Sequence, residues 1–119
     1  MTKRKVVGLK SLVKKLSSLL ESKKAQNVKI IDVSKVTTEF SYMVIADSDN
    51  KYQMESIAYD LLDFANEYKL SVFGSDLNFE SGWIVIDFYD IIVHIMTPVL
   101  REYYQLERIW EVPKMAEVV

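Results

Sequence analysis

The side chains whose types could best support catalysis are one imidazole and two carboxylates that lie close together in the chain. Asp87, Asp90 and His94 lie in or between two strongly apolar runs, residues 83–88 and 91–96. If these runs pair as a hairpin with a two-residue turn, Asp87 and His94 lie diagonally across the strands, within reach of a charge-assisted hydrogen bond. A hydrolytic site also needs a nucleophile, and no Ser or Cys is placed beside this pair. We therefore expect the pair to bind rather than to catalyse.

A nucleotidyl-transfer site is the alternative enzymatic interpretation, because Gly74 and Ser75 precede Asp87 and Asp90. Two carboxylates that share a metal ion from one strand must be two positions apart to point to the same face. Asp87 and Asp90 are three positions apart, and Gly74-Ser75 is not followed by a predicted helix whose N-terminus could hold phosphates. We therefore expect no catalytic residues and no enzyme activity.

The amino-acid composition excludes several kinds of metal and redox site. The 119 residues include no Cys and one His, which excludes disulfides, thiolate metal sites and multi-His metal clusters. We expect neither a metal nor a cofactor. Half of the residues are hydrophobic, so the chain can bury a core, and we expect a single domain over residues 1–119.

The first residues resemble a secretory signal only in part. Lys3, Arg4 and Lys5 precede apolar residues, but Lys10 and Lys14 interrupt what would have to be an uncharged segment. No stretch reaches the roughly 18 uncharged apolar residues that a membrane span needs. We expect a soluble cytoplasmic protein with no membrane contact.

Charge is distributed unevenly along the chain. Residues 1–24 contain eight Lys or Arg and one Glu, whereas the remainder contains seven basic and sixteen acidic side chains. An acidic body is a poor general binder of a phosphate backbone and a better match for a basic protein surface.

The basic segment is also predicted to be a helix. Its apolar residues recur at steps of three and four, which places them on one stripe; they are Leu9, Leu12, Val13, Leu16, Leu19 and Leu20. We interpret residues 1–24 as a basic N-terminal helix whose lysines form a solvated face. Contact with nucleic acid or a membrane surface is the alternative.

The later elements form a core unit at residues 28–111. We predict strands at 28–33 and 42–47, a helix at 51–68, a short strand at 70–73, the hairpin 83–88 and 91–96, and a helix at 99–110. This order predicts an α/β or α+β fold, with helices packed on a mixed sheet of about five strands. The connection through the middle helix should make at least one strand pair parallel.

Alternation gives the predicted hairpin two different faces. One face is wholly apolar and should be covered by helices; it carries Ile84, Ile86, Phe88, Ile91, Val93 and Ile95. The other face carries Trp83, Val85, Asp87, Ile92, His94 and Met96. An aromatic ring and a thioether beside an acid and an imidazole are typical of a binding surface. A second buried layer is the alternative interpretation.

Several blocks, in this order, carry a resemblance to a known family. They are Asp32-Val33-Ser34, residues 41–46, residues 83–96 and residues 101–110. The chain is similar over residues 12–110 to the ribosome silencing factor family, also called Iojap-like. It departs from the family pattern at Ser41, Tyr89 and Met96, where the family has Asp, Gly and Phe.

The resemblance implies a fold like that of nucleotidyltransferases without their catalytic site. It further implies binding to large-subunit ribosomal protein fourteen (uL14), steric exclusion of the small subunit, repression of translation under nutrient limitation, and homodimers. The alternatives are a nucleotidyltransferase-like enzyme and an RNA-binding ribosome assembly adaptor that uses the basic helix.

Together, these interpretations predict a set of partner-binding residues. We expect Trp83 and Met96 to be apolar anchors, Asp87, Asp90 and Glu107 to be acidic partners, and Arg101 and Tyr104 to be hydrogen-bonding rim groups, with His94 on the same face. Packing of the last helix is the alternative for Arg101 and the favoured interpretation for Tyr103, Leu106 and Trp110.

Overall fold

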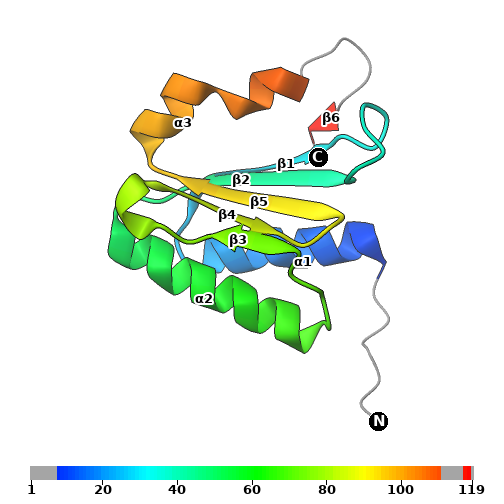
Figure 1. The fold of residues 1–119 in the computed structure, drawn as a ribbon, viewed down its shortest axis with the longest axis horizontal. Helices are drawn as coiled ribbons and strands as arrows, with labels where there is room; N and C mark the ends of the chain where they lie inside the picture. The colour runs from blue at the N-terminus through cyan, green and yellow to red at the C-terminus, as the bar shows by residue number, and fades with distance from the viewer. Residues whose placement is uncertain (1–7, 111–116, 119) are drawn as a thin grey trace.

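A mixed six-stranded β-sheet forms the centre of the fold, in the order β3-β4-β5-β2-β1-β6. The computed structural model describes residues 8–110 and 117–118. The elements are α1 (Leu9–Ser22), β1 (Gln26–Asp32), β2 (Tyr42–Asp47), α2 (Lys51–Glu67), β3 (Gly74–Asp76), η1 (Phe79–Ser81), β4 (Trp83–Asp87), β5 (Ile91–Met96), α3 (Pro98–Tyr104), η2 (Leu106–Trp110) and β6 (Glu117–Val118). Helices α1 and α2 lie on one side of the sheet and α3 on the other (Figure 1).

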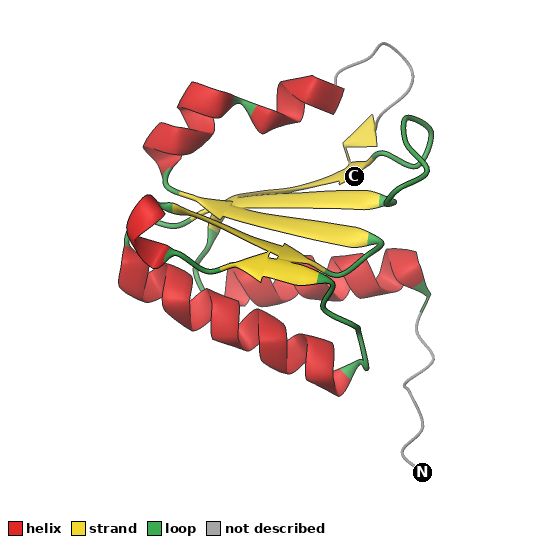
Figure 2. Ribbon diagram, in the orientation of Figure 1, coloured by secondary structure: helices red, strands yellow, loops and turns green. Residues whose placement is uncertain are grey.

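The connectivity matches the predicted order of elements. Strand β2 pairs in parallel with β5, from Tyr42↔Ile91 to Asp47↔Met96, because α2 carries the chain back across the sheet between them. The other neighbours pair antiparallel. The α/β fold with a mixed sheet is therefore confirmed, and Figure 2 shows its helix–sheet–helix layers.

The main core lies between the sheet and the two longer helices. Helix α1 buries Leu12, Val13, Leu16 and Leu20, which confirms the apolar stripe read from the sequence. Helix α2 begins after Asn50, whose side chain accepts a hydrogen bond from the Gln53 backbone N–H at 2.9 Å. None of the helices formed by the described residues is long and apolar enough to span a membrane.

The prediction of a short strand at residues 70–73 was wrong. The strand in this region is β3, which pairs antiparallel with β4 through Gly74↔Asp87 and Asp76↔Val85. It lies at the edge of the sheet and is polar, so it carries no apolar alternation. Leu70 instead packs against the main core, whereas Val72 and Phe73 are exposed.

The prediction of one helix over residues 99–110 was also wrong, because it was too long. Helix α3 ends at Tyr104, and Gln105 adopts a left-handed conformation with φ 47°. The reversal returns the chain to the sheet, where Leu106 and Trp110 pack against a small second cluster of Ile31, Val33 and Met43. Packing of Leu106 and Trp110 is therefore confirmed. Tyr103 is 78% exposed, so its predicted packing role was wrong.

Candidate functional site

The sheet face that carries the predicted binding residues is divided into two parts. We call its buried part the covered half, formed by Met43, Ile45 and Asp47 on β2 and Met96 on β5. We call its partly exposed part the open half, formed by Trp83, Val85 and Asp87 on β4 with Ile92 and His94 on β5. Helix α3 lies on this side of the sheet (Figure 1).

Met96 belongs to the covered half and has no exposed surface. It lies opposite Asp47 on one side and Trp83 on the other. Because α3 begins at Pro98, the chain folds over the end of β5 immediately after Met96. The prediction that Met96 is an exposed anchor was therefore wrong.

Arg101 is also internal, with 8% of its surface exposed. Its guanidinium pairs with the Asp47 carboxylate at 2.9 Å and with the Glu107 carboxylate at 3.3 Å. It also donates a hydrogen bond to the backbone carbonyl of Asn27. The predicted rim role of Arg101 was wrong, because this side chain holds α3 and η2 against the sheet.

Glu107 takes part in the same network. In addition to Arg101, its carboxylate contacts the Lys29 ammonium at 3.6 Å. Asp47, only 5% exposed, accepts a further hydrogen bond from the Asn27 amide at 2.8 Å. Glu107, which was predicted to pair with a basic partner, is thus already paired with Arg101 and Lys29 of its own chain.

The open half carries a row of ring contacts. The Trp83 ring lies 5.1 Å from the Tyr104 ring and 5.9 Å from the His94 ring. Tyr104 is 50% exposed and also contacts Tyr103, with ring centroids 4.9 Å apart. The structure therefore brings three of the predicted residues, Trp83, His94 and Tyr104, into contact with one another.

His94 differs from its predicted role in its hydrogen-bond partner. The Trp83 indole N–H donates to His94 Nδ1 at 3.1 Å, whereas Asp87 accepts from the Tyr89 backbone N–H at 2.8 Å. The predicted Asp87–His94 hydrogen bond was therefore wrong. Burial lowers the pKa of His94 to about 4, so the imidazole is neutral near pH 7 and its Nδ1 can accept. His94 thus fixes the orientation of the indole.

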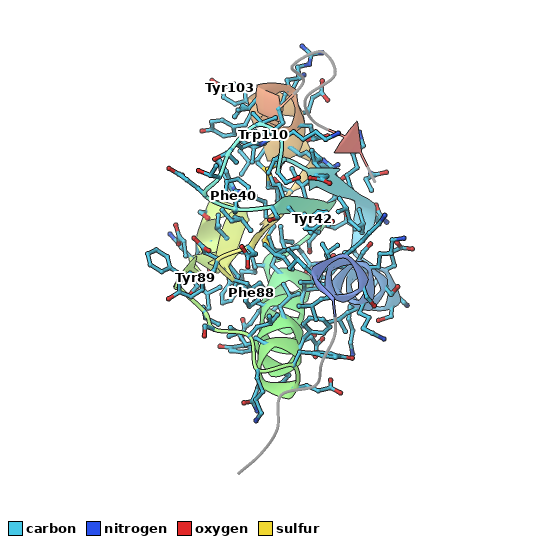
Figure 3. The ribbon with its side chains drawn as sticks, turned by 90° about the vertical axis from the view of Figure 1, so that its right-hand side faces the viewer. Phe40, Tyr42, Phe88, Tyr89, Tyr103 and Trp110 are labelled. Atoms are coloured by element: carbon cyan, nitrogen blue, oxygen red, sulfur yellow. The ribbon has the colours of Figure 1, made fainter. Side chains whose placement is uncertain are left out.

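Two further aromatic side chains extend the open half at the β4–β5 turn. Phe73 and Tyr89 lie with their ring centroids 5.1 Å apart and are 69% and 52% exposed. Figure 3 shows Tyr89, Phe40 and Tyr103 on the same side of the molecule, with Phe88 turned toward the helices. Sequence reasoning missed Phe73 and Tyr89, although an aromatic residue in a tight turn was a signal.

Two hollows lie on the open half. The larger measures about 460 Å³ and is lined by Asp76, Ser81, Trp83, Val85, Leu100 and Tyr104. The smaller measures about 260 Å³ and is lined by Glu39, Phe40, Phe73, Asp87, Tyr89 and Ile92. The lining of each hollow, as described, contains acidic side chains and no Lys or Arg, so both favour a cationic partner.

The arrangement is suited to binding rather than to catalysis. Asp87 faces the open half, whereas Asp90 lies in the exposed turn after β4. Among the residues that the structure describes, no three His, Asp or Glu side chains gather closely enough to hold a metal ion. What the open half offers is fixed aromatic surface with carboxylates beside it.

Comparisons with known proteins point in one direction. A family model described as "Ribosomal silencing factor during starvation" matches residues 8–118. The chain is 31% identical over 91 residues to "Ribosomal silencing factor RsfS" of Chromobacterium violaceum, covering 76% of this chain and 75% of that protein. It is 26% identical over 110 residues to mouse "Mitochondrial assembly of ribosomal large subunit protein 1", covering 87% of this chain and 47% of that protein.

A solved structure shares the fold. The crystal structure of protein CV0518 from Chromobacterium violaceum superposes with a TM-score of 0.81 at 28% identity, covering 92% of each chain.

Proposed function

The chain belongs to the family of ribosomal silencing factors, and from this membership we propose that it binds the large ribosomal subunit through uL14. Bound there, it blocks association with the small subunit and represses translation when nutrients are limiting. A ribosomal silencing factor is a regulator that acts by binding, so the chain is not an enzyme.

The observation that carries the proposal is the open half of the sheet. Its Trp83 and Tyr104 rings are held in place by neighbouring rings and by the His94 imidazole. Asp76 lies beside these rings in the larger hollow, and Asp87 lies beside Phe73 and Tyr89 in the smaller one. Exposed aromatic anchors with acidic neighbours suit a basic ribosomal protein.

The proposed mechanism is steric and needs no chemical step. A protein docked through the open half places the layer of α1 and α2 on the side facing away from its partner (Figure 1). If that partner lies where the small subunit docks, occupancy alone prevents joining. No nucleotide is consumed, so silencing depends only on affinity and concentration.

Sucrose-gradient sedimentation with purified ribosomal subunits tests the proposal. We expect the protein to sediment with large subunits and to reduce the 70S fraction when small subunits are added. Tyr104→Ala should weaken both effects, whereas Tyr59→Ala should weaken neither, because Tyr59 is similarly exposed, at 54%, but lies on α2. Failure of the unaltered protein to sediment with large subunits would end the proposal.

We also propose that the chain functions in the cytoplasm as one domain and that two copies can associate. These proposals rest on the family likeness, not on a contact in the structure. Light scattering during size-exclusion chromatography tests the association directly, and a monomer at all concentrations would contradict it.

A further inference from the structure

The larger hollow has an unusual combination of lining groups. It lies between β3, β4 and α3, and its lining contains two aromatic side chains, two aliphatic side chains, one carboxylate and one serine. Its volume of about 460 Å³ falls within the roughly 300–1,000 Å³ of ordinary small-ligand sites. One long side chain of a partner therefore fits inside it.

The aromatic part of the hollow is preorganised. The Trp83 indole donates to His94 at 3.1 Å, and the Tyr104 ring is tilted by 45° against Trp83. Because these contacts exist before any partner binds, little side-chain freedom is lost on binding. The two rings can offer their faces to a planar or cationic group.

The charged part of the hollow is the Asp76 carboxylate on β3. One of its oxygens accepts a hydrogen bond from the Asn78 backbone N–H at 3.2 Å, and no cation pairs with Asp76 among the described residues. A carboxylate has acceptor capacity for several bonds. Ser81, in contrast, already bonds to the Asn78 and Trp83 backbones.

We propose that this hollow receives one arginine side chain of the basic protein partner, an inference that rests on the proposed function. The guanidinium lies flat against the Trp83 or Tyr104 ring and pairs with the Asp76 carboxylate. A guanidinium fits better than an ammonium, because its planar, weakly hydrated surface stacks on rings while its N–H groups bind a carboxylate in two places. Asp76 is thereby the residue that selects a guanidinium, in addition to the aromatic rings.

A titration followed by NMR tests the hollow without a ribosome. The probe is N-acetyl-arginine amide, with N-acetyl-citrulline amide as an uncharged control of the same shape. The two indole N–H signals provide an internal comparison, because Trp110 lies away from the hollow with its N–H 3.3 Å from the Met43 sulfur. We expect saturable arginine shifts at Trp83 only, and weaker binding of N-acetyl-lysine amide.

Two substitutions locate the charge contact. Asp76→Asn should weaken binding of the arginine probe about threefold to fivefold, as for an exposed ion pair. Glu80→Gln should leave it unchanged, because Glu80 does not line the hollow and pairs with Lys51 at 2.7 Å. Equal shifts with citrulline, stronger binding of lysine, or no effect of Asp76→Asn would each overturn the assignment.

A ribosome experiment separates this inference from the proposed function. The Asp76→Asn protein should bind purified large subunits about tenfold more weakly than the unaltered protein, since a charge pair that is desolvated in a complex contributes more. If the unaltered protein binds and Asp76→Asn binds equally well, the arginine site is wrong while the docking function stands. If the unaltered protein does not bind, the docking function fails.

Discussion

The covered and open halves belong to one sheet face but are built for different tasks. On β5, Met96 is fully buried, whereas His94, two residues earlier, is partly exposed. In the covered half, the Asp47 carboxylate is neutralised by Arg101 of α3. In the open half, rings and carboxylates are left without such a cover. The positions of α3 and η2, rather than the strand pattern, decide which side chains of this face stay exposed.

The same substitution in both halves gives the largest expected contrast. Ile45→Lys places an unpaired charge at a position with no exposed surface, and we expect a loss of about 5 kcal/mol or more in stability, enough to prevent folding. Val85→Lys should fold normally and lose ribosome binding, because its charge faces the open half. Circular dichroism and sedimentation measure the two results. A folded Ile45→Lys protein would break the comparison.

Arg101→Ala sharpens the comparison within the covered half. Removal of the guanidinium leaves the buried Asp47 carboxylate without its cation, so we expect the free energy of unfolding to fall by about 3–5 kcal/mol. Urea denaturation measures the loss. The double variant Asp47→Leu with Arg101→Met should regain most of it, because neither charge then remains unpaired. A loss below about 1 kcal/mol would show that Arg101 is not structural.

His94 of the open half makes stability depend on pH. Its folded pKa of about 4 lies below the ordinary value of 6.5, so the unfolded chain binds the proton more readily. Stability should therefore fall as the pH decreases from about 6.5 toward 4, by up to roughly 3 kcal/mol. His94→Asn, which keeps an acceptor for the Trp83 indole, should have a flatter profile over this range. If stability fell equally with pH in His94→Asn and in the unaltered protein, His94 would not be the cause of the pH dependence.

Asp87→Asn should have the smallest effect. Asp87 lines the smaller hollow of the open half, where a rim charge mainly speeds encounter with a basic surface. We expect large-subunit binding to weaken about fivefold at low salt and less at high salt, since screening reduces the contribution of exposed charges. Association rates at two salt concentrations measure it. A change in dissociation alone would assign Asp87 a different contact.

The comparison also explains which parts of the molecule could be predicted from the sequence. A two-residue turn predicted the hairpin register, and alternation predicted its buried face, because Ile84, Ile86 and Val93 are incompatible with a solvated face. The pairs Ile84↔Ile95 and Ile86↔Val93 confirm it. The fold class was predicted from hydrophobic periodicity and from the sequence blocks that resemble the family. Both can be read from residues that are close together in the chain.

The division of the second face could not be predicted in this way. Met96 and Trp83 are cross-strand partners on one face, so alternation gives them equal status. Their different burial depends on α3, which begins at Pro98 directly after β5 and whose position strand alternation does not predict. Arg101 was misassigned because its carboxylate partner Asp47 lies 54 positions away in the chain.

Hydroxyl-radical footprinting of the protein bound to purified large subunits tests the central claim most directly. Tyrosines occur on both sides of the sheet, so one experiment reads both surfaces. Tyr89, Tyr103 and Tyr104 should become protected on binding, together with Trp83, while Tyr52 and Tyr59 on α2 should react as in the free protein. Protection of Tyr52 and Tyr59 without protection of Trp83 and Tyr104 would contradict docking through the open half.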